Sequence, residues 1–333
     1  MATLNNNVPN LADIAKRVDP DGKTADIVEL LSQTNSILDD MAWKEGNLPT
    51  GNRTTVRDAL PTVSWRKLNT GVASSKSTTS QIDDQSAILE SWSEVDCDIA
   101  KLNGNTFSYR LSEGSAHLES MGQEAAQTLF YGNGTVNPEE YTGFATRYNS
   151  LSANNAQQII SGGGAGSDNS SIWLIGWGEN TVCGIYPKGS MAGLQHEDLG
   201  EQTVQVATGI GTSRMRVFQD RYQWKQGLAI KDQRYVSRIA NVDISDLTGV
   251  SSAADISELM VRASYTLPNL TSVKPTYYMN RTSMQMLDIL NRNDVITGGG
   301  LTFSNVDGVP AHSFRGLSVK LVDQLTETEA TVS

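Results

Sequence analysis

The sequence predicts an α+β protein, and three observations indicate this fold class. Apolar residues make up only 38% of the 333 residues and 29 residues are glycine, a balance that suits a loop-rich protein containing sheet. Apolar residues follow helical spacing in a few separate segments, most clearly at 112–131. Between 150 and 240 the pattern changes to short apolar runs and alternating positions, which are typical of strands. We expect a single interwoven core with extensions on the N-terminal side.

Charge and cysteine content exclude several classes of protein. The chain has 26 basic and 37 acidic residues, a net charge of −11, which disfavours a dedicated nucleic-acid binder. It contains no run of about 18 apolar residues, so we expect no membrane span. No secretory signal is visible at the N-terminus, so we expect an intracellular, reduced protein. Cys97 and Cys183 are too few for a disulfide framework or a four-sulfur zinc site, and we expect buried, inert thiols.

Residues 1–45 predict an N-terminal arm with one helix. Apolar residues follow a helical stripe from Asp26 to Met41, and Thr24 is a suitable N-cap. The residues before this helix are rich in turn formers. A single amphipathic helix buries too little area to fold alone. The arm therefore needs another surface, from the same chain or from a neighbour.

The composition of residues 46–90 predicts an extended hairpin with little core of its own. A cluster of glycine, proline and asparagine at 46–52 and a small-residue tract at 71–80 flank the segment Thr54–Trp65. That segment is β-prone but poor in large aliphatic side chains. The alternative is an ordinary long surface loop, and loops of this length are usually functional or disordered.

The charge of this hairpin differs in sign from that of its flanks. Residues 51–80 hold five basic side chains and one acidic side chain. Residues 1–50 have a net charge of −4, and residues 81–98 hold six acids and no base. We therefore expect the hairpin to lie across a neighbouring subunit, facing one of these acidic blocks, with Trp65 as the apolar anchor. The residues expected at this contact are Arg53, Arg57, Trp65, Arg66 and Lys67.

The strongest predicted helix spans residues 112–131. Ser112 is the expected N-cap, and apolar residues from Leu118 to Leu129 follow at spacings of three and four. Glycine at 132 and 134 ends the pattern. Twenty residues form a rod of about 30 Å, which is suitable as a lateral strut.

The second half of the chain predicts a sheet with two further helices. Ile172–Trp177 is a short apolar run bounded by glycines, as expected of a buried strand. Alternating apolar positions between 204 and 239 predict a meander. We then expect helices at 253–263 and 282–291 and a last strand at 317–322.

Residues 214–238 form the one basic stretch with interleaved aromatic residues. It contains seven bases, two acids and four aromatic side chains. One interpretation is phosphate contact with base stacking. We favour the other, a β-hairpin with one solvated, charged face, because the whole chain is net negative.

No catalytic, cofactor-binding or metal site is predicted. The glycines at 162–166 lack the lysine of a phosphate loop. Of the three histidines, His117, His196 and His312, only His196 has other donors beside it, and adjacent residues do not converge on one ion. Ser64 and Lys67 match a Ser-x-x-Lys spacing without its companion motifs. We therefore expect no enzyme and no cofactor.

The order of these parts resembles the major capsid proteins of tailed bacteriophages, with the Hong Kong 97-type fold. The resemblance is to short-tailed phage relatives and covers nearly the whole chain. The segments that carry it are 26–41, similar to the family's arm; Leu60–Val72, similar to its extended loop; Ile172–Trp177 with Gly184–Ser190, similar to strands of its shell body; and Tyr277–Thr282, similar to a body segment near the capsomer axis.

The resemblance implies four approximate regions. Residues 1–45 would be the N-terminal arm and 46–92 the extended loop. Residues 93–165 would hold the spine helix and the peripheral domain. The β-rich body and the axial domain would occupy residues 166–333.

The resemblance also implies a function. The protein would assemble through hexamers and pentamers into an icosahedral shell around double-stranded phage DNA, in the host cytoplasm, and would remain in the virion. Its partners would be itself, a scaffolding protein, a portal and decoration proteins, with weak, non-specific contact to DNA and no membrane. The alternatives are an encapsulin-like compartment shell and another phage structural protein, such as a tail protein. A small-molecule enzyme would need a site that the sequence does not offer.

Overall fold

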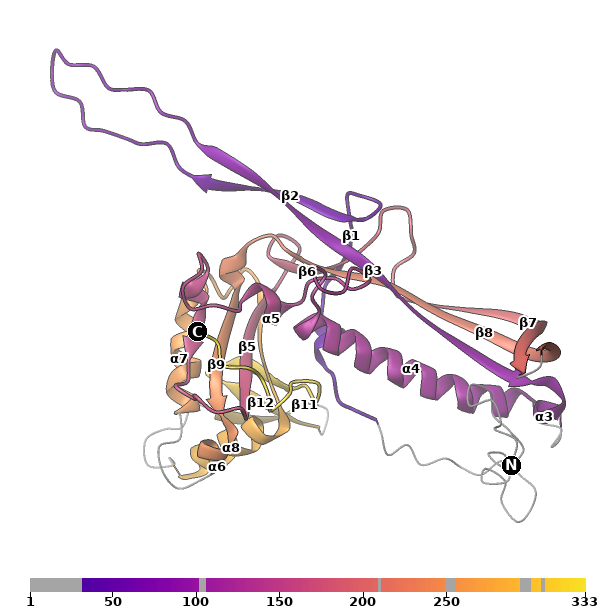
Figure 1. Cartoon of the computed structure of the whole chain (residues 1–333). Helices are drawn as coiled ribbons and strands as arrows, with labels where there is room; N and C mark the ends of the chain where they lie inside the picture. The colour runs from indigo at the N-terminus through magenta and orange to yellow at the C-terminus, as the bar shows by residue number, and fades with distance from the viewer. Residues whose placement is uncertain (1–31, 102–105, 209–210, 249–254, 294–300, 307–308) are drawn as a thin grey trace. The chain divides into compact units, whose positions relative to one another are not determined.

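The computed structural model describes residues 32–101, 106–208, 211–248, 255–293, 301–306 and 309–333 (Figure 1). The chain forms two compact units. We call the first, Met1–Asn35 with Ile88–Ala126 and Gly193–Lys225, the strand–helix unit. We call the second, Ser36–Ala87 with Gln127–Ala192 and Gln226–Ser333, the sheet unit.

Helices and strands are mixed along the chain, which confirms the predicted α+β class. The helices are α2 (Ile37–Asp40), α3 (Cys97–Lys101), α4 (Thr106–Tyr131), α5 (Phe144–Arg147), α6 (Ile244–Thr248), α7 (Ile256–Thr266) and α8 (Arg281–Asn293), with 3-10 turns η1 (Ala156–Gln158) and η2 (Gln233–Tyr235). The strands are β1 (Trp43–Glu45), β2 (Gly51–Ala59), β3 (Thr78–Asp96), β4 (Ile159–Ser161), β5 (Asn169–Trp177), β6 (Val182–Tyr186), β7 (Leu194–Thr208), β8 (Gly211–Ile230), β9 (Val236–Asp243), β10 (Lys274–Met279), β11 (Leu301–Val306), β12 (Val309–Phe314) and β13 (Leu317–Leu321).

The sheet unit is built around β5. All nine residues of this strand are buried. β10 pairs antiparallel with one edge of β5, placing Tyr277 opposite Leu174, and β9 pairs antiparallel with the other edge, placing Ile239 opposite Ile172. A strand covered on both faces carries apolar side chains on both, so its sequence is a continuous apolar run. The buried strand predicted at 172–177 is confirmed.

Each face of this sheet has its own hydrophobic core. Successive strand residues point to opposite faces, so Trp173 and Ile175 lie in one cluster while Ile172 and Leu174 lie in the other. The first cluster packs on α5, where the rings of Phe144 and Trp173 are 5.7 Å apart. The second packs on α6, α7 and α8. The expectation of a single interwoven core is wrong, because the sheet backbone separates the two clusters.

The arm helix predicted over 26–41 is wrong in its described part. Residues before 32, including the expected cap Thr24, lie outside the described residues. Within residues 32–41 only α2 is helical, and Met41 has an extended backbone. The chain then enters the sheet as β1, which pairs parallel with β6. Pairing in a sheet requires extended backbone, so the helix ends at Asp40.

Asp40 attaches α2 to the sheet. Its buried carboxylate accepts hydrogen bonds from Lys274 Nζ at 2.6 Å, Lys320 Nζ at 2.8 Å and the Tyr278 hydroxyl at 2.9 Å. Burial by itself would raise the pKa of Asp40, but these three hydrogen bonds outweigh it and the pKa is lowered. The ionised carboxylate thus joins α2 to β10 and β13.

The predicted hairpin is present as β2 and β3. They pair antiparallel from Gly51 opposite Gln85 to Ala59 opposite Thr78. The strand predicted to continue to Trp65 ends six residues earlier, at Ala59. Pro61 lacks a backbone N–H, which explains why the hydrogen-bonded ladder does not continue past this point.

α4 is the predicted spine helix with a different start. It begins at Thr106, so Ser112 lies inside the helix and the predicted N-cap is wrong. It ends at Tyr131, as the glycine at 132 predicts. A Cβ atom on Gly132 would clash with the carbonyl oxygens of Thr128 and Tyr141, so only glycine fits this turn. At 26 residues the helix is about 39 Å long.

The predicted C-terminal elements are present with shifted ends. α7 begins after Asp255, whose side chain accepts a hydrogen bond from the Glu258 N–H, and α8 begins after Asn280, which caps Ser283 in the same way. Residues 253 and 254 of the first predicted helix lie outside the described part. The predicted meander is the β7–β8 hairpin followed by β9, and the predicted last strand is β13.

The basic stretch 214–238 does not form a hairpin by itself, as had been predicted. It covers most of β8, η2 and the start of β9, and the partner of β8 is the preceding strand β7. The prediction that the basic side chains face solvent is wrong for Arg238, which is buried and forms an ion pair with Glu329 at 2.7 Å. Several other bases of the stretch also contact acidic side chains, as Arg234 does with Asp232 at 2.8 Å.

The Arg238–Glu329 pair holds the C-terminal segment on the sheet unit. Glu329 also accepts hydrogen bonds from the Ser171 hydroxyl and, at 2.6 Å, from the Tyr131 hydroxyl. Its backbone N–H donates to Asn169 O at 2.9 Å. Val322, Leu325 and Val332 belong to the first core cluster. The last twelve residues therefore complete the core.

We expect Glu329→Ala to lower the free energy of unfolding by about 3–5 kcal/mol, because it leaves the buried Arg238 guanidinium without its counter-charge. Urea unfolding followed by circular dichroism measures this. Glu139→Ala is the matched control, since Glu139 is exposed. Equal stability of the two variants would contradict the assigned role of the pair.

We expect Asp40→Asn to lower the free energy of unfolding by about 1–2 kcal/mol at pH 7. The pKa of Asp40 is lowered in the folded chain, so its contribution is present above the unfolded pKa of about 4 and is lost as the pH falls through the folded pKa. The difference between variant and wild type should therefore shrink below pH 4 in urea titrations. The exposed neighbour gives the control Asp39→Asn, for which we expect no comparable loss of stability at pH 7.

Candidate assembly surfaces

The hairpin ends in a long tip that its own chain leaves uncovered. We call residues 60–77 the hairpin tip. Every residue from 60 to 76 is exposed, and no strand is assigned to this segment, which continues beyond β2 and β3 in Figure 1. Asn69 has a φ of 64°, and the Thr70 hydroxyl donates to Lys67 O at 2.9 Å, so the chain turns directly after Lys67.

Apolar and basic side chains share the hairpin tip. Its large apolar residues are all exposed: Leu60, Val63, Trp65, Leu68 and Val72. Its three bases, Arg66, Lys67 and Lys76, have no acid among them. An exposed indole is costly to leave in water, and the basic side chains beside it attract acidic groups, so the hairpin tip suits contact with another molecule.

The predicted contact residues fall into two groups. Trp65, Arg66 and Lys67 lie together in the hairpin tip. Arg53 and Arg57 lie in the paired strand β2 instead. Arg53 forms an ion pair with Asp83 across the hairpin at 2.6 Å, so its charge is already compensated. Arg57 lines a groove of about 900 Å³ in the sheet unit, and two other basic residues, Lys231 and Arg234, also line this groove.

Three of the six acids in the block 81–98 form ion pairs within this chain. Asp83 pairs with Arg53, and Asp84, which is buried, pairs with Arg147 at 2.6 Å. Glu90 pairs with Arg221 at 2.9 Å, and hydrogen bonding to that guanidinium lowers the pKa of Glu90 to about 2. These acids stabilise the subunit itself, so they offer little free charge to a neighbour's hairpin.

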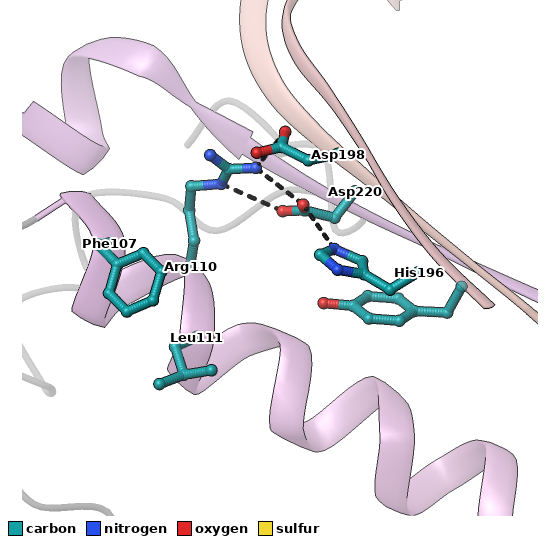
Figure 2. A pocket seen from close by; sticks show the side chains of 7 residues that line it. Phe107, Arg110, Leu111, His196, Asp198 and Asp220 are labelled. Carbon is teal, nitrogen blue, oxygen red and sulfur yellow. Dashed lines mark hydrogen bonds and ion pairs between the residues drawn. The ribbon is translucent and has the colours of Figure 1, made fainter. Parts of the chain in front are cut away.

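A second uncovered surface lies in the strand–helix unit. We call it the helix hollow: a cavity of about 100 Å³ lined by Phe107, Arg110, Leu111, His196, Asp198, Asp220 and Tyr222. Figure 2 shows the three α4 residues on neighbouring turns of the helix, with His196, Asp198 and Asp220 on the adjoining strands.

Ion pairs and ring stacking fix the polar side of the helix hollow. Arg110 Nη2 lies 2.6 Å from Asp198 and 2.8 Å from Asp220 (Figure 2). His196 Nε2 is 3.0 Å from Asp220 Oδ1, and the imidazole stacks on Tyr222 with ring centroids 4.8 Å apart. The hydrogen bond from Arg110 lowers the pKa of Asp198, so this carboxylate stays ionised.

The apolar side of the helix hollow was missed by the sequence analysis. Phe107 is 76% exposed and Leu111 is 63% exposed. Both precede residue 112, where the helix was expected to start. Their spacing of four, followed by Leu118 seven residues later, is helical and could have identified them.

His117 and the two cysteines are at least partly buried in the described part of the chain. His117 bonds the Ser91 hydroxyl at 2.7 Å, and burial lowers its pKa. Cys97 and Cys183 are buried free thiols, and burial raises the pKa of each. Among the described residues no group of three or more histidine, cysteine or acidic side chains is arranged to hold a metal ion. No helix in that part is long and apolar enough to span a bilayer.

The sequence of the chain matches the model of a known protein family. The family model described as Major capsid protein GP7 matches residues 19–333. The chain belongs to this family. It is therefore a structural protein of a bacteriophage capsid shell.

The structural comparison agrees with the family. A chain from the structure of bacteriophage Epsilon15 has a TM-score of 0.79 and 29% identity, covering 100% of this chain and 99% of that chain. The predicted Hong Kong 97-type capsid fold is thereby confirmed.

Other solved chains match with much lower TM-scores. The capsid of an empty GTA particle gives a TM-score of 0.42 at 11% identity, covering 69% of this chain and 97% of that chain. The SrpI encapsulin of Synechococcus elongatus PCC 7942 gives 0.40 at 10% identity, covering 70% and 96%. No curated protein sequence matches the chain.

Because the hairpin tip makes no contribution to the cores, we expect Trp65→Ala to leave the thermal midpoint of the unassembled subunit within about 2 °C of wild type. Trp173→Ala, at a buried site of the same residue type, should lower it by about 5–10 °C. Differential scanning calorimetry measures both. A large loss of stability in Trp65→Ala would show that the tip is part of the fold.

Proposed function

We propose that this protein assembles through hexamers and pentamers into an icosahedral shell that encloses double-stranded phage DNA, and that the hairpin tip holds neighbouring subunits together. The observation that carries the second part is the uncovered run 60–76, in which exposed apolar residues and three bases lie together. When another molecule covers such a surface, its apolar area is removed from water and the free energy falls.

The energetics suit reversible assembly. An exposed ion pair contributes about 0–1 kcal/mol, and full burial of one large apolar side chain contributes about 1.5–3 kcal/mol. One such contact is weak. Symmetry repeats it in every subunit, so a closed shell becomes stable while a misplaced subunit can still dissociate.

The proposed regions of the subunit follow the expected order. Residues 1–45 are the arm, 46–92 the extended loop, 93–165 the spine helix and peripheral domain, and 166–333 the body and axial domain. The length of α4 and the hairpin pairing of β2 with β3 support the second and third of these assignments.

The net charge of the chain guides the proposal for its contact with DNA. The chain has a net charge of −11, so we propose weak contact with packaged DNA, without sequence preference. We further propose a scaffolding protein, a portal and decoration proteins as partners, assembly in the host cytoplasm, and neither catalytic activity nor a cofactor.

We expect the double variant Arg66→Glu with Lys67→Glu to reduce the yield of closed particles at least tenfold, or to confine assembly to a narrow range of salt. Reversing two charges makes the hairpin tip repel the acidic surface that its bases would contact. Sedimentation and negative-stain microscopy measure the yield, and circular dichroism confirms that each subunit is folded.

Lys188→Glu with Arg214→Glu is the matched control, since it changes the net charge equally at exposed positions outside the hairpin tip. We expect it to assemble. If the Arg66 and Lys67 variant forms particles as well as this control across the salt range, the hairpin tip does not hold subunits together.

A further inference from the structure

We propose that a Ca²⁺ ion binds in the sheet unit between Asp168 and Asp243, with the side-chain oxygen of Asn169 as a third ligand. Asp168 and Asn169 follow the glycine-rich residues 162–166, which we call the glycine loop, and Asp243 is the last residue of β9. β5 and β9 pair antiparallel with Asn169 opposite Asp243 (Figure 1). The three side chains therefore lie at one end of this strand pair.

Asp168 and Asp243 place two carboxylates side by side. Their side chains lie within hydrogen-bonding reach of each other. Asp168 Oδ2 accepts a hydrogen bond from the Ser245 N–H at 3.2 Å. Asp243 Oδ1 accepts from the Ser245 hydroxyl at 2.9 Å and from the Asp246 N–H at 3.0 Å. Neither carboxylate forms an ion pair with a basic side chain of the described residues, and two carboxylates this close repel each other unless a proton or a cation lies between them.

The second oxygen of each carboxylate borders the glycine loop. A Cβ atom on Gly166 would lie 2.7 Å from Asp168 Oδ1 and 3.1 Å from Asp243 Oδ2. The space beside both oxygens is thus open only because residue 166 has no side chain. Ca²⁺ binds oxygen at about 2.3–2.6 Å, so an ion near this position needs only small side-chain movements to contact both. Gly166 is exposed and the two aspartates are half-buried, so the ion can enter from solvent.

The buried side chain of Asn169 supplies an oxygen without a hydrogen-bond partner. Its Nδ2 donates to Gly166 O at 2.7 Å, which fixes which end of the amide is the oxygen. Oδ1 makes no hydrogen bond with the described residues, although Asn169 is fully buried. A Cβ atom on Gly164 would lie 2.5 Å from this oxygen and 3.0 Å from Asp243 Cβ, so the oxygen faces the same loop and the same aspartate. Buried polar atoms almost always have a partner, and beside two carboxylates that partner is a cation.

The donor set suits Ca²⁺. Carboxylate and amide oxygens are hard ligands of the kind that Ca²⁺ and Mg²⁺ prefer, whereas Zn²⁺ prefers imidazole and thiolate. Mg²⁺ demands a near-ideal octahedron, and two adjacent residues with one from another strand cannot adjust independently to provide it. Because only two ligands are charged, we expect a dissociation constant of about 0.1–1 mM, at the weak end of calcium sites.

A cation at this position would be structural and would strengthen the attachment of the C-terminal segment. The Thr331 hydroxyl donates to Gly166 O at 3.3 Å, and the Glu329 N–H donates to Asn169 O at 2.9 Å. Fixing the glycine loop and Asn169 therefore also fixes the partners of the C-terminal segment. Since the three ligands come together only in the folded chain, Ca²⁺ binding stabilises that chain.

Isothermal titration calorimetry of the full chain with CaCl₂, as the unassembled subunit, tests the site. We expect one saturable site in the wild type and at least tenfold weaker binding in Asp168→Asn with Asp243→Asn. Each asparagine keeps an oxygen that can accept the native hydrogen bonds, so we expect this variant to fold, as circular dichroism checks. Asp168→Asn alone, which should weaken binding at least threefold, decides the question if the double variant does not fold.

Asp246→Asn is the matched control, since this exposed acid is close to Asp243 in the sequence. We expect its affinity to stay within threefold of the wild type. Absence of saturable Ca²⁺ binding by the wild type up to about 10 mM would overturn the proposal. An equal loss in the control would also overturn it, because the ion would then be attracted by acidic surface in general. Equal affinity for MgCl₂ would overturn the assignment to calcium.

A steric variant gives a second test that leaves both carboxylates in place. Gly166→Ala puts a Cβ atom against Asp168 Oδ1, and we expect at least fivefold weaker Ca²⁺ binding. In differential scanning calorimetry, about 5 mM CaCl₂ should raise the thermal midpoint of the wild type by about 2–3 °C and that of this variant by under about 1 °C. Gly122→Ala is the control, since a Cβ there meets no atom within 4 Å. If both glycine variants bind Ca²⁺ equally well, the ion does not lie beside the glycine loop and the proposal is wrong.

Discussion

Burial of β5 on both faces is the constraint on which the rest of the subunit depends. Nine consecutive buried residues need a covering layer on each side, and the chain supplies α6, α7 and α8 on one side and α5, with the end of α4, on the other. The C-terminal segment completes the second layer through the buried pair of Arg238 and Glu329. Once these elements cover the sheet, they are not available to cover the hairpin tip.

The uncovered surfaces are consistent with the function of the family. A capsid subunit must fold alone and then join copies of itself, so part of its apolar surface has to remain exposed after folding. Here the fold is stabilised by two cores and by Asp40, with its two lysines, in the sheet unit. The hairpin tip contributes nothing comparable. Stability and assembly are therefore assigned to different residues, and substitutions should affect one without the other.

Local patterns predicted much of this architecture, and long-range contacts account for the errors. The run 172–177, the end of α4 at Gly132 and the hairpin follow from nearby residues. Arg238 was expected on a solvated face because its partner, Glu329, lies 91 residues away. The arm helix was overpredicted: within its described part only Ile37–Asp40 is helical, and the chain then enters the sheet as β1. Phe107 and Leu111 were missed since an apolar side chain that faces solvent does not look like part of a core.

Protection of the hairpin tip on assembly is the central claim, and limited proteolysis measures it most directly. Trypsin should cleave unassembled subunits rapidly after Arg66 and Lys67, because this segment is exposed. In purified particles we expect cleavage there to slow at least tenfold relative to the exposed Lys188, as quantified by mass spectrometry of the peptides. Equal cleavage rates at the tip in subunits and particles would contradict the account.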